Sequence, residues 1–143
     1  MTELDRALVR RKLAAITRNL DDLGAVEGLT LEEFRRDRFR QKGSERLLQE
    51  IVEAAADANV HLVRALGQPA PSDYYDSFVQ MGVHGVIQDS LARRLAPAAG
   101  LRNRLVHQYE AIDDAIVLGA VAGARRDFAE YVAAVEAYLG RDR

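Results

Sequence analysis

The sequence predicts an all-α fold in which antiparallel helices form a bundle. Apolar residues recur every three or four positions along several long segments, which is the period of an amphipathic helix. No window alternates apolar and polar residues as a half-buried strand would, and only three prolines interrupt the chain. The connections between the helical segments are short, so consecutive helices should lie antiparallel. We expect the 143 residues to form a single domain that spans 1–143.

Two helices are expected in the first forty or so residues. The first should run from Thr2 to about Leu23, with Thr2 as its N-cap and Asp5 in its first turn. The sequence Thr30-Leu31-Glu32-Glu33 is a capping box and should open a second, short helix. This second helix is expected to end near residues 37–39.

The longest amphipathic pattern runs from Ser44 to Leu66, where apolar residues form one broad face. Gly67 and the prolines after it should stop this helix. Ser72 or Asp73 is the expected N-cap of the next, shorter helix.

The second half of the chain is expected to contain three more helices. They should cover Val86–Leu95, Leu101–His107 and the long segment from Asp113 to Leu139. Gly119 and Gly123 lie four residues apart in the last segment, a spacing that usually marks the close approach of another helix.

The composition excludes several classes of function. The chain has no cysteine, which excludes disulfides, thiolate zinc sites and cysteine nucleophiles and argues against a secreted protein. Residues 1–11 are charged throughout, so no signal peptide is expected. The longest uncharged apolar stretch, Ala115–Ala124, is far shorter than the roughly 20 residues of a membrane helix. We therefore expect a cytoplasmic protein with no membrane segment. Its net charge of −2 means that any site for a polyanion must be a local patch.

Such a patch is predicted within residues 91–108, where the chain carries four arginines and no acidic residue. On a helical wheel Arg102 and Tyr109 nearly eclipse, and Asn103 and His107 share the adjacent sector. A guanidinium, an amide, an imidazole and a phenol on one face suit a phosphodiester. Arginine offers phosphate a planar fork, and histidine transfers protons near neutral pH. The alternative interpretation is a solvated helix end.

The spacing Arg102-Asn103-x-x-x-His107-x-Tyr109 resembles the motif of the HEPN superfamily, in the form found in HepT-like toxins, Arg-x4-His-x-Tyr. The resemblance covers residues 1–139 and includes the long central helix with Glu53 and Asp57 and the stretch 71–85. It implies a HEPN-like antiparallel four-helix bundle with additional short helices.

The resemblance also implies a function. It implies a metal-independent endoribonuclease toxin of a type VII (HEPN/MNT) toxin–antitoxin system, with no cofactor and with a minimal nucleotidyltransferase (MNT) antitoxin as its partner. In this interpretation Arg102 and His107 cleave RNA, and Tyr109 is the residue to which the antitoxin adds AMP. Asn103 and Arg104 are expected to support RNA binding.

The mechanism predicts an oligomeric state. His107 should help to activate the 2′-OH or protonate the leaving 5′-oxygen, while Arg102 stabilises the phosphorane. The products would be a 2′,3′-cyclic phosphate and a 5′-hydroxyl. One such histidine per chain cannot readily perform both proton transfers, so we expect a homodimer that places two motifs in one cleft. The alternative is a non-catalytic HEPN module that binds nucleotide or RNA as the partner subunit of a minimal nucleotidyltransferase.

A polar stripe follows the apolar face of the predicted Ser44–Leu66 helix and consists of Arg46, Glu50, Glu53, Asp57 and His61. One interpretation is a metal site formed by the last three of these residues. Another is a solvated face with i,i+4 ion pairs such as Arg46–Glu50 and Asp57–His61. We favour a third, in which Glu53 or Asp57 pairs with Arg102 and orients its guanidinium, and we expect no metal.

Two further features have ordinary explanations. Residues 35–46 contain five arginines and one lysine mixed with acidic residues, which indicates either a solvated surface or an extension of an RNA-binding groove. Tyr74 and Tyr75 are expected in packing or in a dimer contact rather than in chemistry.

Overall fold

The computed structural model describes residues 3–141, and within this range all regular secondary structure is helical. The predicted all-α class is therefore confirmed. The helices are α1 (Arg6–Leu23), α2 (Leu31–Arg35), α3 (Arg38–Ala65), α4 (Tyr74–Val83), α5 (Asp89–Leu95), α6 (Ala98–His107) and α7 (Asp114–Arg141). In the part of the chain that the structure describes, no helix has the length and apolar character needed to span a bilayer.

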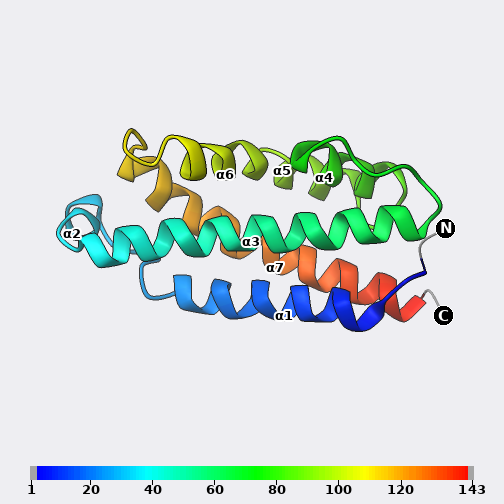
Figure 1. The fold of residues 1–143 in the computed structure, drawn as a ribbon. Helices are drawn as coiled ribbons and strands as arrows, with labels where there is room; N and C mark the ends of the chain where they lie inside the picture. The colour runs from blue at the N-terminus through cyan, green and yellow to red at the C-terminus, as the bar shows by residue number, and fades with distance from the viewer. Residues whose placement is uncertain (1–2, 142–143) are drawn as a thin grey trace.

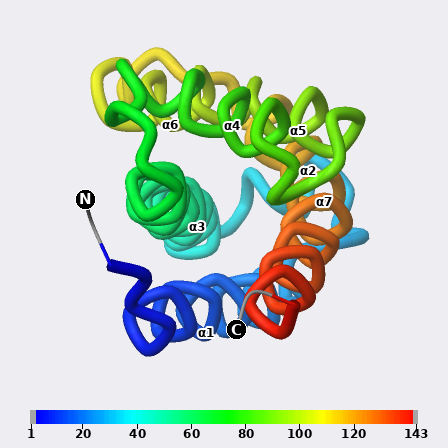
Figure 2. Tube along the Cα trace, turned by 90° about the vertical axis from the view of Figure 1, so that its right-hand side faces the viewer, coloured from blue at the N-terminus to red at the C-terminus, as the bar shows by residue number. Residues whose placement is uncertain are grey.

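The long helices α1, α3 and α7 run side by side, and the chain reverses direction from α1 to α3 (Figure 1). The short helices α4, α5 and α6 together occupy the fourth position of the bundle, where α4 contacts both α5 and α6 (Figure 2); we call these three helices the row of short helices. Seen end-on, α1, α3, α7 and this row surround a common centre (Figure 2). The predicted antiparallel four-helix bundle with additional short helices is confirmed, with its fourth position shared by three short helices.

Three aromatic rings pack in the centre of the bundle. Phe78 of α4 and Phe128 and Tyr131 of α7 are all buried, and their ring centroids lie 6.1 to 6.2 Å apart in edge-to-face arrangements. Such pairs stabilise a core beyond the area they bury. The cluster fixes the row of short helices against α7.

A chain of buried hydrogen bonds crosses the same region. The Tyr131 hydroxyl donates to Oδ1 of Asn59 (2.6 Å), and Nδ2 of Asn59 donates to Oγ of Ser77 (3.1 Å). The Ser77 hydroxyl in turn donates to the backbone carbonyl of Tyr74 (2.7 Å). A buried polar group without a partner would cost about 1–3 kcal/mol. This series of hydrogen bonds therefore favours one arrangement of α7, α3 and α4 over others that would break it. It thereby places the first turn of α4, which borders the site described below.

The starts predicted for the second helix and for the helix after the prolines are right. Both hydrogen bonds of the capping box form, from the Glu33 amide to Oγ1 of Thr30 (3.1 Å) and from the Thr30 amide to Oε1 of Glu33 (3.0 Å). Asp73 rather than Ser72 caps α4. The first helix begins later than predicted, since Asp5 is its N-cap and accepts from the Leu8 amide (3.0 Å). Thr2, the predicted cap, lies outside the described residues.

Three other predicted starts are wrong. The central helix begins at Arg38 instead of Ser44, because Asp37 caps it and its first turns stand in solvent, where no apolar pattern marks them. The helix predicted from Val86 begins at Asp89, since Val86 is buried in the preceding loop. Conversely, α6 begins three residues before Leu101, at Ala98.

The expected close helix contact at Gly119 and Gly123 is also wrong. A Cβ at Gly119 would meet nothing within 4 Å, and one at Gly123 would meet only the flexible end of Arg126 at 4.0 Å. Gly123 instead lines an apolar pocket of about 230 Å³ between α3, α6 and α7, to which Leu101 and Leu105 also contribute.

Candidate active site

Helix α6 carries the motif that the sequence singles out. Leu105 is buried and Leu101 is partly buried against the core, so the opposite side of the helix faces solvent as expected. The helix ends at His107, and the amide of the next residue, Gln108, donates to the carbonyl of Arg104 (2.8 Å). The polar residues of the motif therefore occupy the exposed side and the end of a short helix whose apolar side is anchored.

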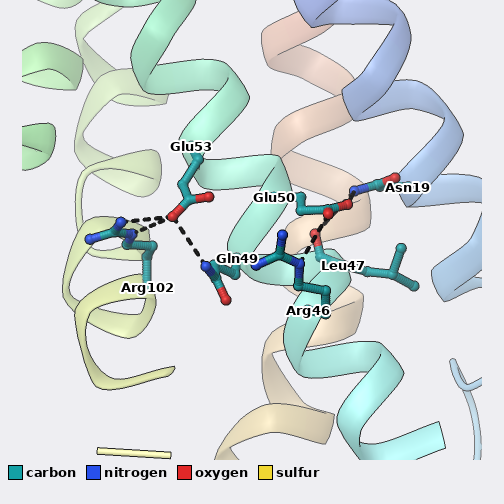
Figure 3. Close-up of polar contacts among 7 residues, drawn as sticks. All are labelled: Asn19, Arg46, Leu47, Gln49, Glu50, Glu53 and Arg102. Atoms are coloured by element: carbon teal, nitrogen blue, oxygen red, sulfur yellow. Dashed lines mark hydrogen bonds and ion pairs between the residues drawn. The ribbon is translucent and has the colours of Figure 1, made fainter. Parts of the chain in front are cut away.

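Arg102 forms an ion pair with Glu53 of α3. Its Nε and Nη2 donate to the same carboxylate oxygen, Oε2, at 2.9 and 2.7 Å (Figure 3). Gln49, one helical turn before Glu53, donates to this oxygen from Nε2 at 3.2 Å. Of the two acidic residues that we considered as partners of Arg102, the structure selects Glu53.

Two further contacts hold the guanidinium of Arg102. Its Cζ lies 4.8 Å from the ring centroid of Tyr74, a cation–π contact. Its Nη1 donates to Oδ1 of Asn103 at 3.3 Å. Together the hydrogen bonds to Glu53 and Asn103 use three of the five N–H groups of Arg102 and leave one on each terminal nitrogen. The side chain is 21% exposed, so a positioned fork remains for an anion that approaches from solvent.

His107 differs from the other two histidines of the chain. His61 accepts a hydrogen bond from the Asp5 amide at Nε2 (2.8 Å), and His84 is bound to Gln80 (3.1 Å). His107 is exposed and has no hydrogen-bond or ion-pair partner among residues 3–141. Its imidazole is therefore free to exchange protons with a bound molecule.

The local positive field predicted for residues 91–108 is weaker than the sequence indicates. Arg93 pairs with an acidic residue one turn away on α5, and Arg94 and Arg102 pair with residues of α7 and α3. The hydrogen bond from Arg94 also holds the pKa of Glu130 below its usual range. Within the described part of the chain, Arg104 is the arginine of this set that forms no ion pair. The acid that pairs with Arg93 lies just before this segment, and those that pair with Arg94 and Arg102 lie far along the sequence, so the segment by itself shows only the arginines.

Tyr109 does not follow the helical wheel. Because α6 ends at His107, Tyr109 lies in the turn that the Ala111 amide closes onto the Gln108 carbonyl (2.9 Å). Its predicted place beside Arg102 on one helix face is therefore wrong. Tyr109 is 56% exposed, so it does not pack beneath the final helix.

The polar stripe of α3 divides between two neighbours. Glu53 faces α6, whereas Asp57 pairs with Lys12 of α1 (3.0 Å) and not with His61. Glu50 accepts from Asn19 of α1 (3.1 Å) and forms the expected pair with Arg46 (3.1 Å). Among the described residues no three carboxylate, imidazole or thiol groups are arranged to hold a metal ion.

Residues 35–46 form a surface on which opposite charges pair. The ion pairs of this surface include Arg36–Glu32 (2.5 Å), Arg40–Asp37 (3.4 Å), Lys42–Glu45 (3.4 Å) and Arg35–Asp114 (3.7 Å). This pairing favours the interpretation of a solvated surface over that of an extended RNA-binding groove.

The sequence analysis missed two residues that contact the site. The sequence predicts that Tyr74 serves packing or a dimer contact, yet its ring supports Arg102. Gln49 was not considered, although its position four residues before Glu53 on one helix face is a signal that it could contact that carboxylate.

Comparison with known proteins identifies the family. The family model described as "Ribonuclease HepT-like" matches residues 13–135. The tRNA nuclease HepT of Aphanizomenon flos-aquae is 34% identical over 139 residues, covering 97% of this chain and 95% of that protein. The mRNA nuclease HepT of Shewanella oneidensis is 28% identical over 130 residues, covering 91% and 97%. A tri-AMPylated Shewanella oneidensis HEPN toxin, solved in complex with an MNT antitoxin, superposes with a TM-score of 0.83 at 27% identity, covering 94% of this chain and 99% of that chain. This chain therefore belongs to the HepT-like ribonuclease family of HEPN toxins, and its enzyme class is endoribonuclease.

Proposed function

We propose that this chain is the metal-independent endoribonuclease toxin of a type VII (HEPN/MNT) system and that it acts in the cytoplasm. The observation that carries the proposal is the state of Arg102 and His107. The guanidinium is held by Glu53, Asn103 and Tyr74 with two N–H groups left over, and the imidazole at the end of the same helix has no partner among residues 3–141.

The two side chains divide the chemistry of RNA cleavage between them. Arg102 binds the scissile phosphate and stabilises the charge that develops on the phosphorane, where a positioned donor is most effective. His107 transfers a proton, either from the attacking 2′-OH or to the leaving 5′-oxygen. The reaction leaves a 2′,3′-cyclic phosphate and a 5′-hydroxyl and needs no water as nucleophile. Asn103 and Arg104, both exposed on α6, supply further contacts to RNA.

A homodimer completes the site in this proposal. Each chain brings one unengaged histidine, whereas the reaction needs one base and one acid. The apolar pocket beside Arg102, lined by Leu101, Leu105 and Gly123, gives a second copy an apolar surface to cover. Ile116, 40% exposed at the start of α7, lies one helical turn before Ala120, which lines the pocket, and so adds apolar surface on the same side of α7. Two-fold pairing here would bring two α6 helices together.

The proposed partner is a nucleotidyltransferase antitoxin that adds AMP to Tyr109. Support comes from the tri-AMPylated Shewanella oneidensis toxin, which was solved with its MNT antitoxin, and from the exposure of the Tyr109 side chain in a turn. Each AMP would bring a negative charge close to the end of α6, where it competes with RNA for Arg102 and Arg104.

The decisive experiment is cleavage of a labelled RNA by the purified chain in EDTA. We expect products with 2′,3′-cyclic phosphate ends and their loss in Arg102→Ala and His107→Ala. Arg93→Ala is the matched control, because Arg93 is exposed and pairs only with Asp89 in the described structure. Tight RNA binding without products would favour the non-catalytic module instead.

Sedimentation tests the dimer. A chain that sediments as a monomer at micromolar concentration while it still cleaves RNA would contradict the two-histidine arrangement.

A further inference from the structure

A recess lies beside Arg102 on the side away from the apolar pocket. It has a volume of about 330 Å³ and is lined by Asp73, Tyr74, Tyr75, Ala99, Gly100, Arg102 and Asn103. This volume lies at the small end of the range of ligand sites, about 300–1,000 Å³. The recess is formed where the first turn of α4 meets the first half of α6.

The recess exists because α6 carries small residues where it faces α4. Ala99 is buried, and Gly100 has no side chain at all. A Cβ added at Gly100 would meet nothing within 4 Å, so the space there is open rather than filled by a neighbour. A glycine inside a helix costs about 1 kcal/mol relative to alanine, and nothing in the packing around Gly100 requires one. Gly100 therefore leaves open a space that a larger side chain at this position would fill.

The walls of the recess suit a flat, uncharged, polar ring. Tyr75 is 54% exposed and presents an aromatic face on which a ring can stack. Because Oδ1 of Asn103 already accepts from Arg102, the amide offers a ligand its N–H donors. Asp73 contributes a carboxylate, one oxygen of which caps α4 at 2.7 Å from the Asp76 amide. Donor, acceptor and aromatic face together match the edge and the face of a nucleobase.

The charges place the base and the phosphate on different sides of Arg102. A phosphate inside the recess would lie close to the Asp73 carboxylate, which repels it, whereas a base is neutral. The guanidinium of Arg102 forms part of the wall and also offers the free N–H groups for phosphate. A nucleotide can therefore place its phosphate on Arg102 and its base in the recess.

We propose that the recess between α4 and α6 is a base-binding subsite, which holds one RNA nucleobase next to the phosphate bound by Arg102. The inference rests on the proposed ribonuclease function and deepens it. Tyr75 stacks on the base, and Asn103 and Asp73 bind its edge. Every base carries an N–H donor beside an acceptor on its Watson–Crick edge, so these two contacts suit a nucleobase in general and do not select one of the four.

Gly100→Leu tests the proposal by filling the recess. Leucine is a better helix former than glycine and has open space there, so the variant should melt no lower than the wild type. Gly140→Leu is the matched control, because a Cβ at this exposed position in the last turn of α7 also meets nothing within 4 Å, yet it does not line the recess. Tyr75→Ala removes the stacking face, and Tyr75→Phe retains it.

The first readout is the dissociation constant for a short fluorescent 2′-O-methyl oligoadenylate, which cannot be cleaved. We expect binding about tenfold weaker for Gly100→Leu and Tyr75→Ala, the size of loss that follows removal of one stacking aromatic. Gly140→Leu and Tyr75→Phe should stay within about twofold of the wild type. For an oligomer of abasic nucleotides, the affinity of the wild type should fall to that of the recess variants. The affinity of the recess variants should not fall further when the bases are absent.

The second readout, kcat/KM on unmodified RNA, separates this inference from the proposed function. If the wild type cleaves RNA but the recess variants bind and cleave as it does, the subsite is wrong and the ribonuclease proposal stands. If the wild type neither binds nor cleaves RNA, both fail. Base-dependent binding without cleavage would support the subsite and refute the catalytic proposal. If the recess substitutions weaken binding of abasic RNA as much as they weaken binding of oligoadenylate, the recess holds something other than a base. That result would overturn the inference.

Discussion

Glu53→Gln is the substitution that tests most directly how the site is built. The carboxylate oxygen Oε2 receives three N–H donors, two from Arg102 at 2.9 and 2.7 Å and one from Gln49 at 3.2 Å. Glutamine preserves the shape and one acceptor oxygen but removes the charge, and its amide N–H groups can accept none of these donors. The variant therefore weakens the anchor of the guanidinium while it leaves the surrounding packing unchanged.

The structure sets the size of the effect on stability. Hydrogen bonds to charged groups contribute about 1.5–3 kcal/mol, whereas fully exposed ion pairs contribute about 0–1 kcal/mol. The side chains of Arg102 and Glu53 are 21% and 28% exposed, so the pair lies between these limits. We expect the free energy of unfolding to fall by about 1–2 kcal/mol, which lowers Tm by several degrees.

The effect on catalysis should exceed the effect on folding. A misplaced reacting group can cost roughly a hundredfold in rate, so we expect kcat to fall by roughly 10- to 100-fold. KM should change little or decrease, since a guanidinium released from Glu53 has more N–H groups to offer the phosphate of the bound RNA. This division between kcat and KM marks Glu53 as a positioning residue.

Steady-state RNA cleavage well below Tm, with melting monitored by circular dichroism, measures both effects. Glu50→Gln is the matched control, because Glu50 lies on the same helix but binds Arg46 and Asn19 instead of Arg102. The argument is refuted if Glu53→Gln retains the wild-type kcat, or if the control loses as much activity.

The remaining predictions concern the chemistry, its regulation and the core. Arg102→Ala and His107→Ala should each abolish toxicity on expression without unfolding the protein, as circular dichroism can check. If both variants remain toxic, the catalytic assignment is refuted. Co-expression with the cognate nucleotidyltransferase should add mass in multiples of AMP to the peptide that contains Tyr109, and Tyr109→Phe should gain none; an unmodified peptide with full neutralisation would mean that occlusion alone suffices. Burial raises the pKa of Tyr131 well above the ordinary value of about 10. The unfolded chain therefore loses this proton first, so stability should fall as the pH rises above about 10, by up to 1.4 kcal/mol per pH unit. Tyr131→Phe should show a flatter alkaline limb in urea unfolding and, near neutral pH, a loss of about 1 kcal/mol from the missing bond to Asn59.

The bundle could be predicted because its determinants are local. Helical periodicity and capping each depend on residues within one or two turns of one another, as the reciprocal bonds of Thr30 and Glu33 illustrate. The predicted helix boundaries are wrong where no local apolar pattern marks the end of a helix. The exposed first turns of α3 around Phe39, which is 92% exposed, carry a pattern that periodicity cannot distinguish from a loop.

The motif on α6 was visible in the sequence, but its electrostatics were not. The segment has no acid of its own, yet Arg94 is neutralised by Asp127, 33 residues away, and Arg102 by Glu53, 49 residues away. Tyr109 was misplaced because the wheel assumes a helix that continues, whereas α6 ends two residues earlier.

The sequence by itself determined that this protein is helical, that residues 102–109 carry the polar motif and that Leu105 points into the core. Each of these follows from side-chain types repeated at the period of a helix. Only the tertiary structure decided that Glu53 and not Asp57 meets Arg102, since the two carboxylates lie on one stripe of α3 and different neighbours cover its two edges. The recess between α4 and α6 is likewise a property of packing. A glycine on one helix and an exposed tyrosine on another form a site only where the fold brings them together.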